Sequence, residues 1–300
     1  MCDFSSFGGR SEEWVAVEAS LPSPPAGESF SETTRRINKE REEIAAAGVK
    51  ALASPVLTRD FSIPTRDGSV IEARSYRSVD LTESTEPQPV YIHLHGGGFV
   101  FGTLDSEDGI CSRLAVAARV IILNVNYRHT PEHTYPTAWH DAEDAFKWTH
   151  DNINDLGGDS GAVVMGGISA GAQLTASLVL GQHLGKTSIA TYPPIAGQVL
   201  MIPCLVNPEC YEPQLRKMKD PSVSSYKENI DAPILPVTRV KFFTDLLRIE
   251  SLEVDDLALN PGNALPSQVK GLPPTTFGIT GLDPLRDEGL LYAKMLAEEG

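Results

Sequence analysis

The residues best suited to chemistry lie in the pentapeptide GISAG at positions 167–171, which contains Ser169. An apolar run at 163–166 precedes it, and apolar residues at 170, 174 and 178 follow with the spacing of one helix face. A serine on a sharp strand-to-helix turn can act as a nucleophile, and the turn needs small residues two positions to either side. Gly167 and Gly171 meet that requirement. The pentapeptide alone also occurs by chance in glycine-rich loops, so a second motif is needed.

The second motif is His95-Gly96-Gly97-Gly98, directly after a predicted strand at 91–94. Consecutive glycines let backbone N–H groups point into open space, where they can stabilise a developing oxyanion. A phosphate-binding loop would continue with Lys-Ser or Lys-Thr, whereas the apolar run 99–101 follows here. The sequence therefore favours an oxyanion hole beside a hydrophobic acyl or alcohol group.

Composition restricts the partners of such a site. The 300 residues carry a formal net charge of −15, which makes nucleic acid or an anionic membrane unsuitable as a partner. Neutral or cationic small molecules are better suited as ligands. The four cysteines lack CxxC spacing, so free thiols are expected. No signal peptide and no membrane-spanning run is predicted, which favours a cytoplasmic location.

The elements that position the two motifs follow from hydrophobic periodicity. An antiparallel hairpin is predicted at 57–63 and 70–76, and a charged, solvent-facing helix at 31–47. Strands at 90–94, 120–125, 162–166, 198–202 and 275–280 alternate with helices at 107–118, 138–153 and 284–299. Loops are predicted at 21–27 and 82–88. This alternation predicts an α/β fold with a mostly parallel sheet and helices on both faces.

Three parts are predicted along the chain. Residues 1–56 form an N-terminal lead-in or cap segment, and residues 57–203 and 257–300 form the α/β core. Residues 204–256 are rich in proline and acidic residues, with apolar patches. They interrupt the alternation and are predicted to form a helical cap inserted over the carboxyl edge of the sheet.

Taken together, the motifs identify a resemblance. HGGG and GxSxG in this order, a Tyr127-Arg128 signature that continues through 131–136, and an acidic turn at 281–289 resemble the hormone-sensitive-lipase-like family of α/β-hydrolases. The resemblance covers about 91–300. It implies an α/β-hydrolase fold with a cap and carboxylesterase activity on a small-molecule ester through a serine nucleophile, with no metal and no organic cofactor. The sequence leaves a homodimer open.

The resemblance also implies roles for individual residues. Ser169 matches the nucleophile and Asp283 the acid that orients the base, with Asp287 a weaker match. The N–H groups of Gly97, Gly98 and Ala170 match the oxyanion hole. His95 and Gly96 match residues that support the loop of the oxyanion hole. Gly167 and Gly171 match the small residues on either side of the serine in the sharp strand-to-helix turn. Arg128 and Glu132 are expected to form a structural ion pair or loop brace, and Ile168 stands where the family often has Asp.

The general base has no match in the chain. In this fold the order is serine, acid, histidine, yet residues 284–300 contain no histidine and all seven histidines precede Asp283. We expect the base beyond residue 300, together with the last strand and helix of the fold, and favour this over a naturally incomplete protein. This chain alone is then expected to be an impaired catalyst.

Two other functions stay open. The fold is similar to that of plant gibberellin receptors, in which the pocket binds a small molecule without catalysis, and the missing base favours this alternative. The fold also serves lyases and acyltransferases of specialised metabolism, which sequence alone does not separate from a hydrolase.

Overall fold

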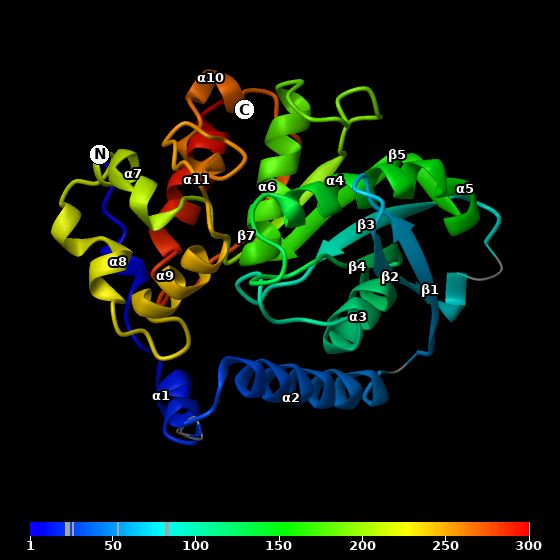
Figure 1. The fold of residues 1–300 in the computed structure, drawn as a ribbon, viewed down its shortest axis with the longest axis horizontal. Coiled ribbons are helices and arrows are strands. Elements are labelled where there is room, and N and C mark those ends of the chain that lie inside the picture. The colour runs from blue at the N-terminus through cyan, green and yellow to red at the C-terminus, as the bar shows by residue number, and fades with distance from the viewer. Residues whose placement is uncertain (22–24, 26, 53, 82–83, 300) are drawn as a thin grey trace.

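One sheet organises the molecule. The computed structural model describes residues 1–21, 25, 27–52, 54–81 and 84–299, so the predicted loops at 21–27 and 82–88 lie partly outside the described residues. Within this part, seven strands form a single sheet in the order β1-β2-β4-β3-β5-β6-β7 (Figure 1). The predicted mostly parallel α/β architecture is confirmed.

The antiparallel and parallel portions of the sheet divide as the sequence predicted. The hairpin strands β1 (Val56–Pro64) and β2 (Val70–Ser78) pair antiparallel, and β2 also pairs antiparallel with β4. All other neighbours are parallel. The remaining strands are β3 (Gln88–Leu94), β4 (Ile121–Asn126), β5 (Gly158–Ile168), β6 (Gly197–Met201) and β7 (Thr275–Gly278).

Helices cover both faces of the sheet (Figure 1). On one face α3 (Asp108–Ala118) buries Cys111 and Ala115 against Tyr76 and Ile122. The opposite face carries α4, α6 and α11, which share two larger clusters with the strands. Their bounds are Thr137–Asp151, Ala170–His183 and Arg286–Glu299, and a short α5 (Ile153–Leu156) follows α4. The helix predicted at 138–153 corresponds to α4, which ends at Asp151 before α5 begins.

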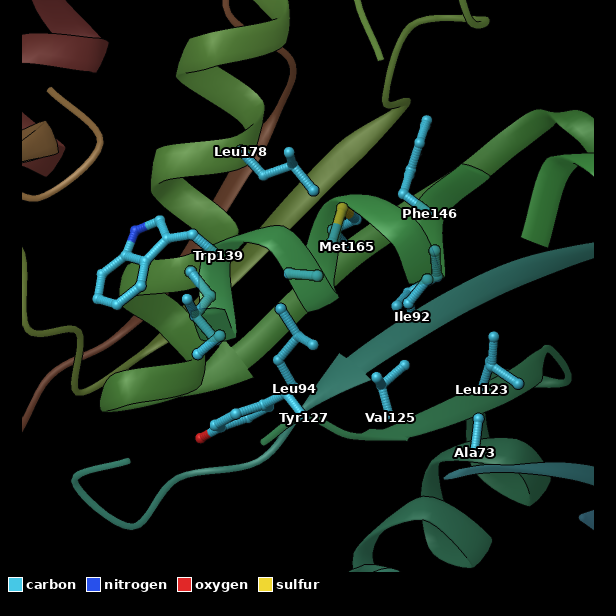
Figure 2. Packing of buried hydrophobic residues seen from close by; sticks show 14 of the residues in the cluster. Ala73, Ile92, Leu94, Leu123, Val125, Tyr127, Trp139, Phe146, Met165 and Leu178 are labelled. Carbon is cyan, nitrogen blue, oxygen red and sulfur yellow. The ribbon is translucent and has the colours of Figure 1, made fainter. Parts of the chain in front are cut away.

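Strand residues on one side of the pleat build the larger core. Ile92, Leu94 and Met165 are fully buried and meet Phe146 of α4 and Leu178 of α6 (Figure 2). Alternate side chains of the same strands, such as Tyr91, face α3. Because the central strands are buried on both faces, their sequences are nearly continuous apolar runs, which is typical of parallel strands.

The remaining elements gather beside the β7 end of the sheet and below it (Figure 1). The N-terminus joins this region, because Cys2 forms a parallel bridge with Met218. The helices are α1 (Glu12–Glu18), α2 (Phe30–Lys50), α7 (Glu212–Leu215), α8 (Ser225–Glu228), α9 (Val237–Leu246) and α10 (Pro266–Val269). Short 3-10 turns lie at Ser5–Phe7, Val79–Leu81, Asp105–Glu107, Pro208–Cys210, Pro221–Val223 and Pro261–Asn263.

Three other predictions can be compared with the structure. The four cysteines are free, as expected. No helix in the described residues is long and apolar enough to cross a membrane. The predicted solvent-facing helix forms as α2, but one of its faces packs on α3 and on the 3-10 turn Asp105–Glu107. On this face Glu42 accepts a hydrogen bond from the Thr103 hydroxyl at 2.8 Å.

Candidate active site

Ser169 occupies a strained turn between β5 and α6. Its backbone lies at φ 54° and ψ −113°, a conformation that residues with a side chain rarely adopt. The surrounding backbone holds it there. The Ser169 N–H donates to the Met201 carbonyl on β6 at 2.8 Å, and the Ser169 carbonyl accepts from the Gln173 N–H at 3.0 Å. No described residue hydrogen-bonds the side-chain hydroxyl, which leaves it free to face a ligand.

The glycines around Ser169 permit a close approach of strand and helix. A Cβ on Gly167 would lie 2.3 Å from the Gly171 carbonyl carbon, and a Cβ on Gly171 would lie 2.0 Å from the Leu94 carbonyl oxygen. These obstacles are backbone atoms, which cannot rotate away. Ile168 lies against residues 95–98, the HGGG segment that is called the oxyanion loop below, since a Cβ on Gly96 would be 2.8 Å from the Ile168 carbonyl oxygen.

The HGGG loop leaves two backbone donors open. Gly97 and Gly98 have φ values of 139° and 63°, and their N–H groups donate to no acceptor among the described residues. The turn is closed instead by the N–H groups of Val100 and Phe101, which donate to the Gly97 carbonyl at 3.1 and 3.0 Å. The N–H of Ala170 is also open, because Ala170 is the first residue of α6 and has no intrahelical acceptor.

His95 supports this loop from the buried side. Its Nδ1 lies 3.2 Å from the Gly96 carbonyl and its Nε2 lies 3.3 Å from Nε2 of His129. Its ring stacks on Tyr127, whose hydroxyl donates to the His95 carbonyl at 2.8 Å. Burial, with a contribution from His129, lowers the pKa of His95 to about 3. His95 is therefore neutral, and its Nδ1–H can donate to Gly96.

Arg128 braces a neighbouring segment, but through different partners than expected. Its guanidinium contacts Asp141 of α4 and Asp67 of the hairpin turn, each at 2.6 Å. Glu132 is exposed and forms no ion pair with Arg128 in the described part of the chain, so the predicted Arg128–Glu132 ion pair is wrong, while the bracing role fits Arg128. The sequence could not choose between these carboxylates because Asp67 and Asp141 come close only in the folded chain.

Asp283 lies in the turn after β7. Its side chain is buried and accepts from the Leu285 N–H at 2.9 Å, with the Thr280 hydroxyl at 3.5 Å. Burial raises its pKa, and these hydrogen bonds only partly oppose the shift. Asp287 is occupied elsewhere, in an ion pair with Arg286 at 2.9 Å and a hydrogen bond from the Ser225 N–H at 2.7 Å. Of the two acids, only Asp283 faces the cavity described next.

A cavity of about 740 Å³ brings these residues together. Ser169, Asp283, Gly97 and Gly98 lie on its wall, and apolar side chains supply most of the remainder. A second chamber of about 30 Å³ adjoins Ser169 and includes Ala170 and Phe243. The apolar walls of the large cavity are Phe7, Trp14, Ile37, Phe101, Ile202, Pro233, Ile234, Leu235, Phe243 and Leu282.

Comparison with known proteins gives this arrangement a family. A family model described as an alpha/beta hydrolase fold matches residues 91–300. The chain belongs to this hydrolase family. It is 37% identical over 213 residues to esterase LipI of Mycobacterium tuberculosis, an alignment that covers 71% of this chain and 61% of LipI. This chain thus spans less than two thirds of that relative.

Solved structures of hydrolases and a cyclase are also similar. An esterase from Pyrobaculum calidifontis has a TM-score of 0.75 at 30% identity, covering 97% of this chain and 86% of that one. A vibralactone cyclase has a TM-score of 0.81 at 25% identity, covering 100% and 85% of the two chains.

No histidine lines either chamber beside Ser169 in the described part of the chain. His93 and His95 lie behind the oxyanion loop, and burial lowers the pKa of His129 to about 4. The other histidines are placed by α4, α6 and the segment before α4: His133, His140, His150 and His183. The described residues also hold no cluster of three or more His, Cys, Asp or Glu suited to a metal ion.

The sequence analysis missed two residues of the candidate site. Phe243 of α9 covers Gly98, where a Cβ would lie 2.3 Å from its ring. Arg41 of α2 contacts the Gly96 carbonyl at 3.0 Å. Phe243 lay in an apolar patch that the sequence marked only as part of the cap. Arg41 sat among charged residues whose helical spacing fits a solvated face equally well.

Proposed function

We propose that this hydrolase is a serine carboxylesterase that acts on small to medium hydrophobic esters through an acyl-enzyme on Ser169. The observation that carries the proposal is the position of Ser169, on a strained turn in an apolar cavity beside the open N–H groups of Gly97 and Gly98. The similarity to named esterases supports the same chemistry.

In the proposed mechanism, the Ser169 hydroxyl oxygen attacks the ester carbonyl carbon and its proton passes to a histidine base. Asp283 orients that base, which none of the described histidines supplies at this site. The resulting oxyanion accepts hydrogen bonds from the N–H groups of Gly97, Gly98 and Ala170. The ester C–O bond then breaks and the alcohol leaves with the proton. Water hydrolyses the acyl-enzyme, which releases the carboxylic acid and restores the hydroxyl.

The sizes of the two chambers suggest which part of an ester lies on each side of Ser169. The small chamber, about 30 Å³, has room for roughly two water molecules, which is the size of a short acyl group. The large cavity is mostly apolar and accommodates a bulkier alcohol. We therefore propose that acetate and other short acyl esters are preferred over long-chain esters.

The proposal extends to the organisation of the chain. Residues 1–56 and 204–256 are proposed to act as caps over a core of 57–203 and 257–300. This division is supported by the cavity, because Trp14, Leu235 and Phe243 line it together with Ser169. A small-molecule ester is the proposed partner, and a cytoplasmic location and a homodimer stay open to localisation and light-scattering measurements.

The test is labelling by a fluorophosphonate probe together with turnover of p-nitrophenyl acetate and butyrate. Because no histidine of the described residues lines the chambers beside Ser169, turnover is measured with and without imidazole, which can take up the serine proton. Ser169→Ala is the matched control, since imidazole alone also cleaves activated esters. We expect labelling of Ser169 and imidazole-dependent turnover well above that of Ser169→Ala. If both proteins respond equally to imidazole and neither is labelled, the esterase proposal is wrong.

A second candidate is intramolecular acyl transfer, favoured by the similarity to vibralactone cyclase. It would use the same acyl-enzyme but release the acyl group to an internal hydroxyl instead of water. Product analysis by mass spectrometry separates the two, because hydrolysis adds the mass of water. A non-catalytic receptor is the remaining alternative and would leave Ser169 unlabelled.

A further inference from the structure

Helix α2 holds the oxyanion loop with three side chains from one face. The Asn38 side-chain oxygen accepts from the Gly102 N–H at 2.9 Å, and Glu42 accepts from the Thr103 hydroxyl at 2.8 Å. Between them, Nη1 of Arg41 donates to the Gly96 carbonyl at 3.0 Å. The spacing i, i+3, i+4 places all three side chains on one helix face. This helix precedes the residues matched by the family model, 91–300.

Arg41 is fixed from its other side by a buried carboxylate. Its Nη2 lies 2.7 Å from Oε1 of Glu107, whose side chain is 4% exposed. The other oxygen of Glu107 lies 3.0 Å from Nε2 of His93 on β3, and the Ser106 hydroxyl donates to Oε1 at 3.1 Å. The guanidinium therefore has little freedom, because its fork is held at Glu107 and at Gly96.

The carbonyl that Arg41 contacts belongs to the peptide unit that ends in the Gly97 N–H. A hydrogen bond to a peptide carbonyl polarises the whole unit, so its N–H becomes a stronger donor. The same carbonyl lies 3.2 Å from Nδ1 of the neutral His95, a second donor. A Cβ on Gly97 would lie 3.0 Å from Nη1 of Arg41, so the guanidinium lies directly against this peptide.

We propose that Arg41 is a positioning residue of the oxyanion hole: it fixes the plane of the Gly96–Gly97 peptide and strengthens its N–H as a donor to the oxyanion. This inference rests on the proposed esterase function. It makes α2 part of the machinery that stabilises the transition state, rather than a cover on the outside of the core.

The test compares Arg41→Met, Arg41→Lys and a control on the same helix, Lys39→Met. Lys39 is exposed and pairs only at 3.9 Å with Glu43 among the described residues. The first readout is the amide resonance of Gly97 in protein labelled with ¹⁵N-glycine, which needs no catalysis. The second is imidazole-supported p-nitrophenyl acetate turnover, separated into kcat and KM, and thermal unfolding is followed in parallel.

In Arg41→Met we expect the Gly97 amide proton to move upfield and kcat to fall about 10- to 100-fold, with KM within about twofold, because the interaction is made in the transition state. Arg41→Lys keeps a charged donor and should recover part of both effects. Lys39→Met should match wild type.

Other outcomes separate this inference from the esterase proposal. If the Gly97 resonance is the same in Arg41→Met and Lys39→Met, or only the unfolding temperature changes, Arg41 is merely structural and the inference is wrong. If the Gly97 resonance moves while wild type lacks any Ser169-dependent turnover, the coupling of α2 to Gly97 stands and the esterase proposal has failed.

Discussion

Gly171 illustrates how tightly single residues are constrained around Ser169. A Cβ there would lie 2.0 Å from the Leu94 carbonyl oxygen, and both α6 and β3 would have to move. We predict that Gly171→Ala lowers the free energy of unfolding by about 3 kcal/mol, the upper range for overpacking. Urea denaturation measures the change. Gly161→Ala, where the nearest atom is 3.4 Å away, is the control. Equal losses in the two variants would contradict the steric argument.

We expect the side chain of Glu288 to make the free energy of unfolding depend on pH. It is fully buried in α11, where its carboxylate accepts from the Leu205 N–H at 2.6 Å, and burial raises its pKa well above the usual value. A raised pKa means that the folded state binds more protons than the unfolded state, so stability present at acid pH is lost as pH rises above about 4.5.

For Glu288→Gln we predict a flatter profile and greater stability than wild type at pH 8. The slope that disappears is at most about 1.4 kcal/mol per pH unit, which corresponds to one proton. Unfolding in urea at several pH values measures it. The exposed Glu86→Gln should leave the wild-type slope unchanged. A Glu288→Gln protein that is less stable than wild type at pH 8 would show that the carboxylate is favourable in the core.

At the scale of elements, α4 is fastened to the segment after β4 by Asp141. This carboxylate is fully buried and accepts from the Arg128 N–H at 2.9 Å and from its guanidinium at 2.6 Å. We predict that Asp141→Ala costs about 3 kcal/mol, because it leaves a largely buried cation without its main partner. Calorimetry measures the loss. In the exposed pair Arg59–Asp155, Asp155→Ala should cost less than about 1 kcal/mol. Similar losses would argue against a structural role for this pair.

Most elements could be predicted from sequence because their patterns are local. Strand β3 and helix α4 follow from apolar periodicity within a few residues of their observed ends. Strand β7 ends at Gly278, two residues early, because the chain turns toward Asp283, which Thr280 contacts. The contacts of α2 could not be predicted, since charged side chains at helical spacing fit a solvated face and a buried loop equally well. Only the tertiary fold places Arg41 against Gly96.

At the scale of the whole molecule, the cavity exists only where distant parts of the chain meet. Trp14 comes from α1, Phe243 from α9 and Ser169 from the end of β5, yet all three line one space. Each part alone would leave its apolar surface open to water. Burying these surfaces against each other while leaving about 740 Å³ free favours apolar ligands, since such a ligand completes the burial.

The fluorescence of Trp14 can report whether α1 lines the same cavity as Ser169. The other two tryptophans, Trp139 and Trp148, belong to α4 and do not line the cavity. Trp139 is buried in the core cluster, and Trp148 packs against that cluster. We predict that titration with butaneboronic acid, an apolar ligand for a serine hydroxyl, changes the intrinsic fluorescence of wild type with saturation. Trp14→Phe should lose this change while Trp148→Phe keeps it. A response that survives in Trp14→Phe would mean that α1 does not lie over Ser169 in solution. A response lost in Ser169→Ala as well as in Trp14→Phe would place the ligand between Ser169 and α1, because fluorescence senses only groups near the ring.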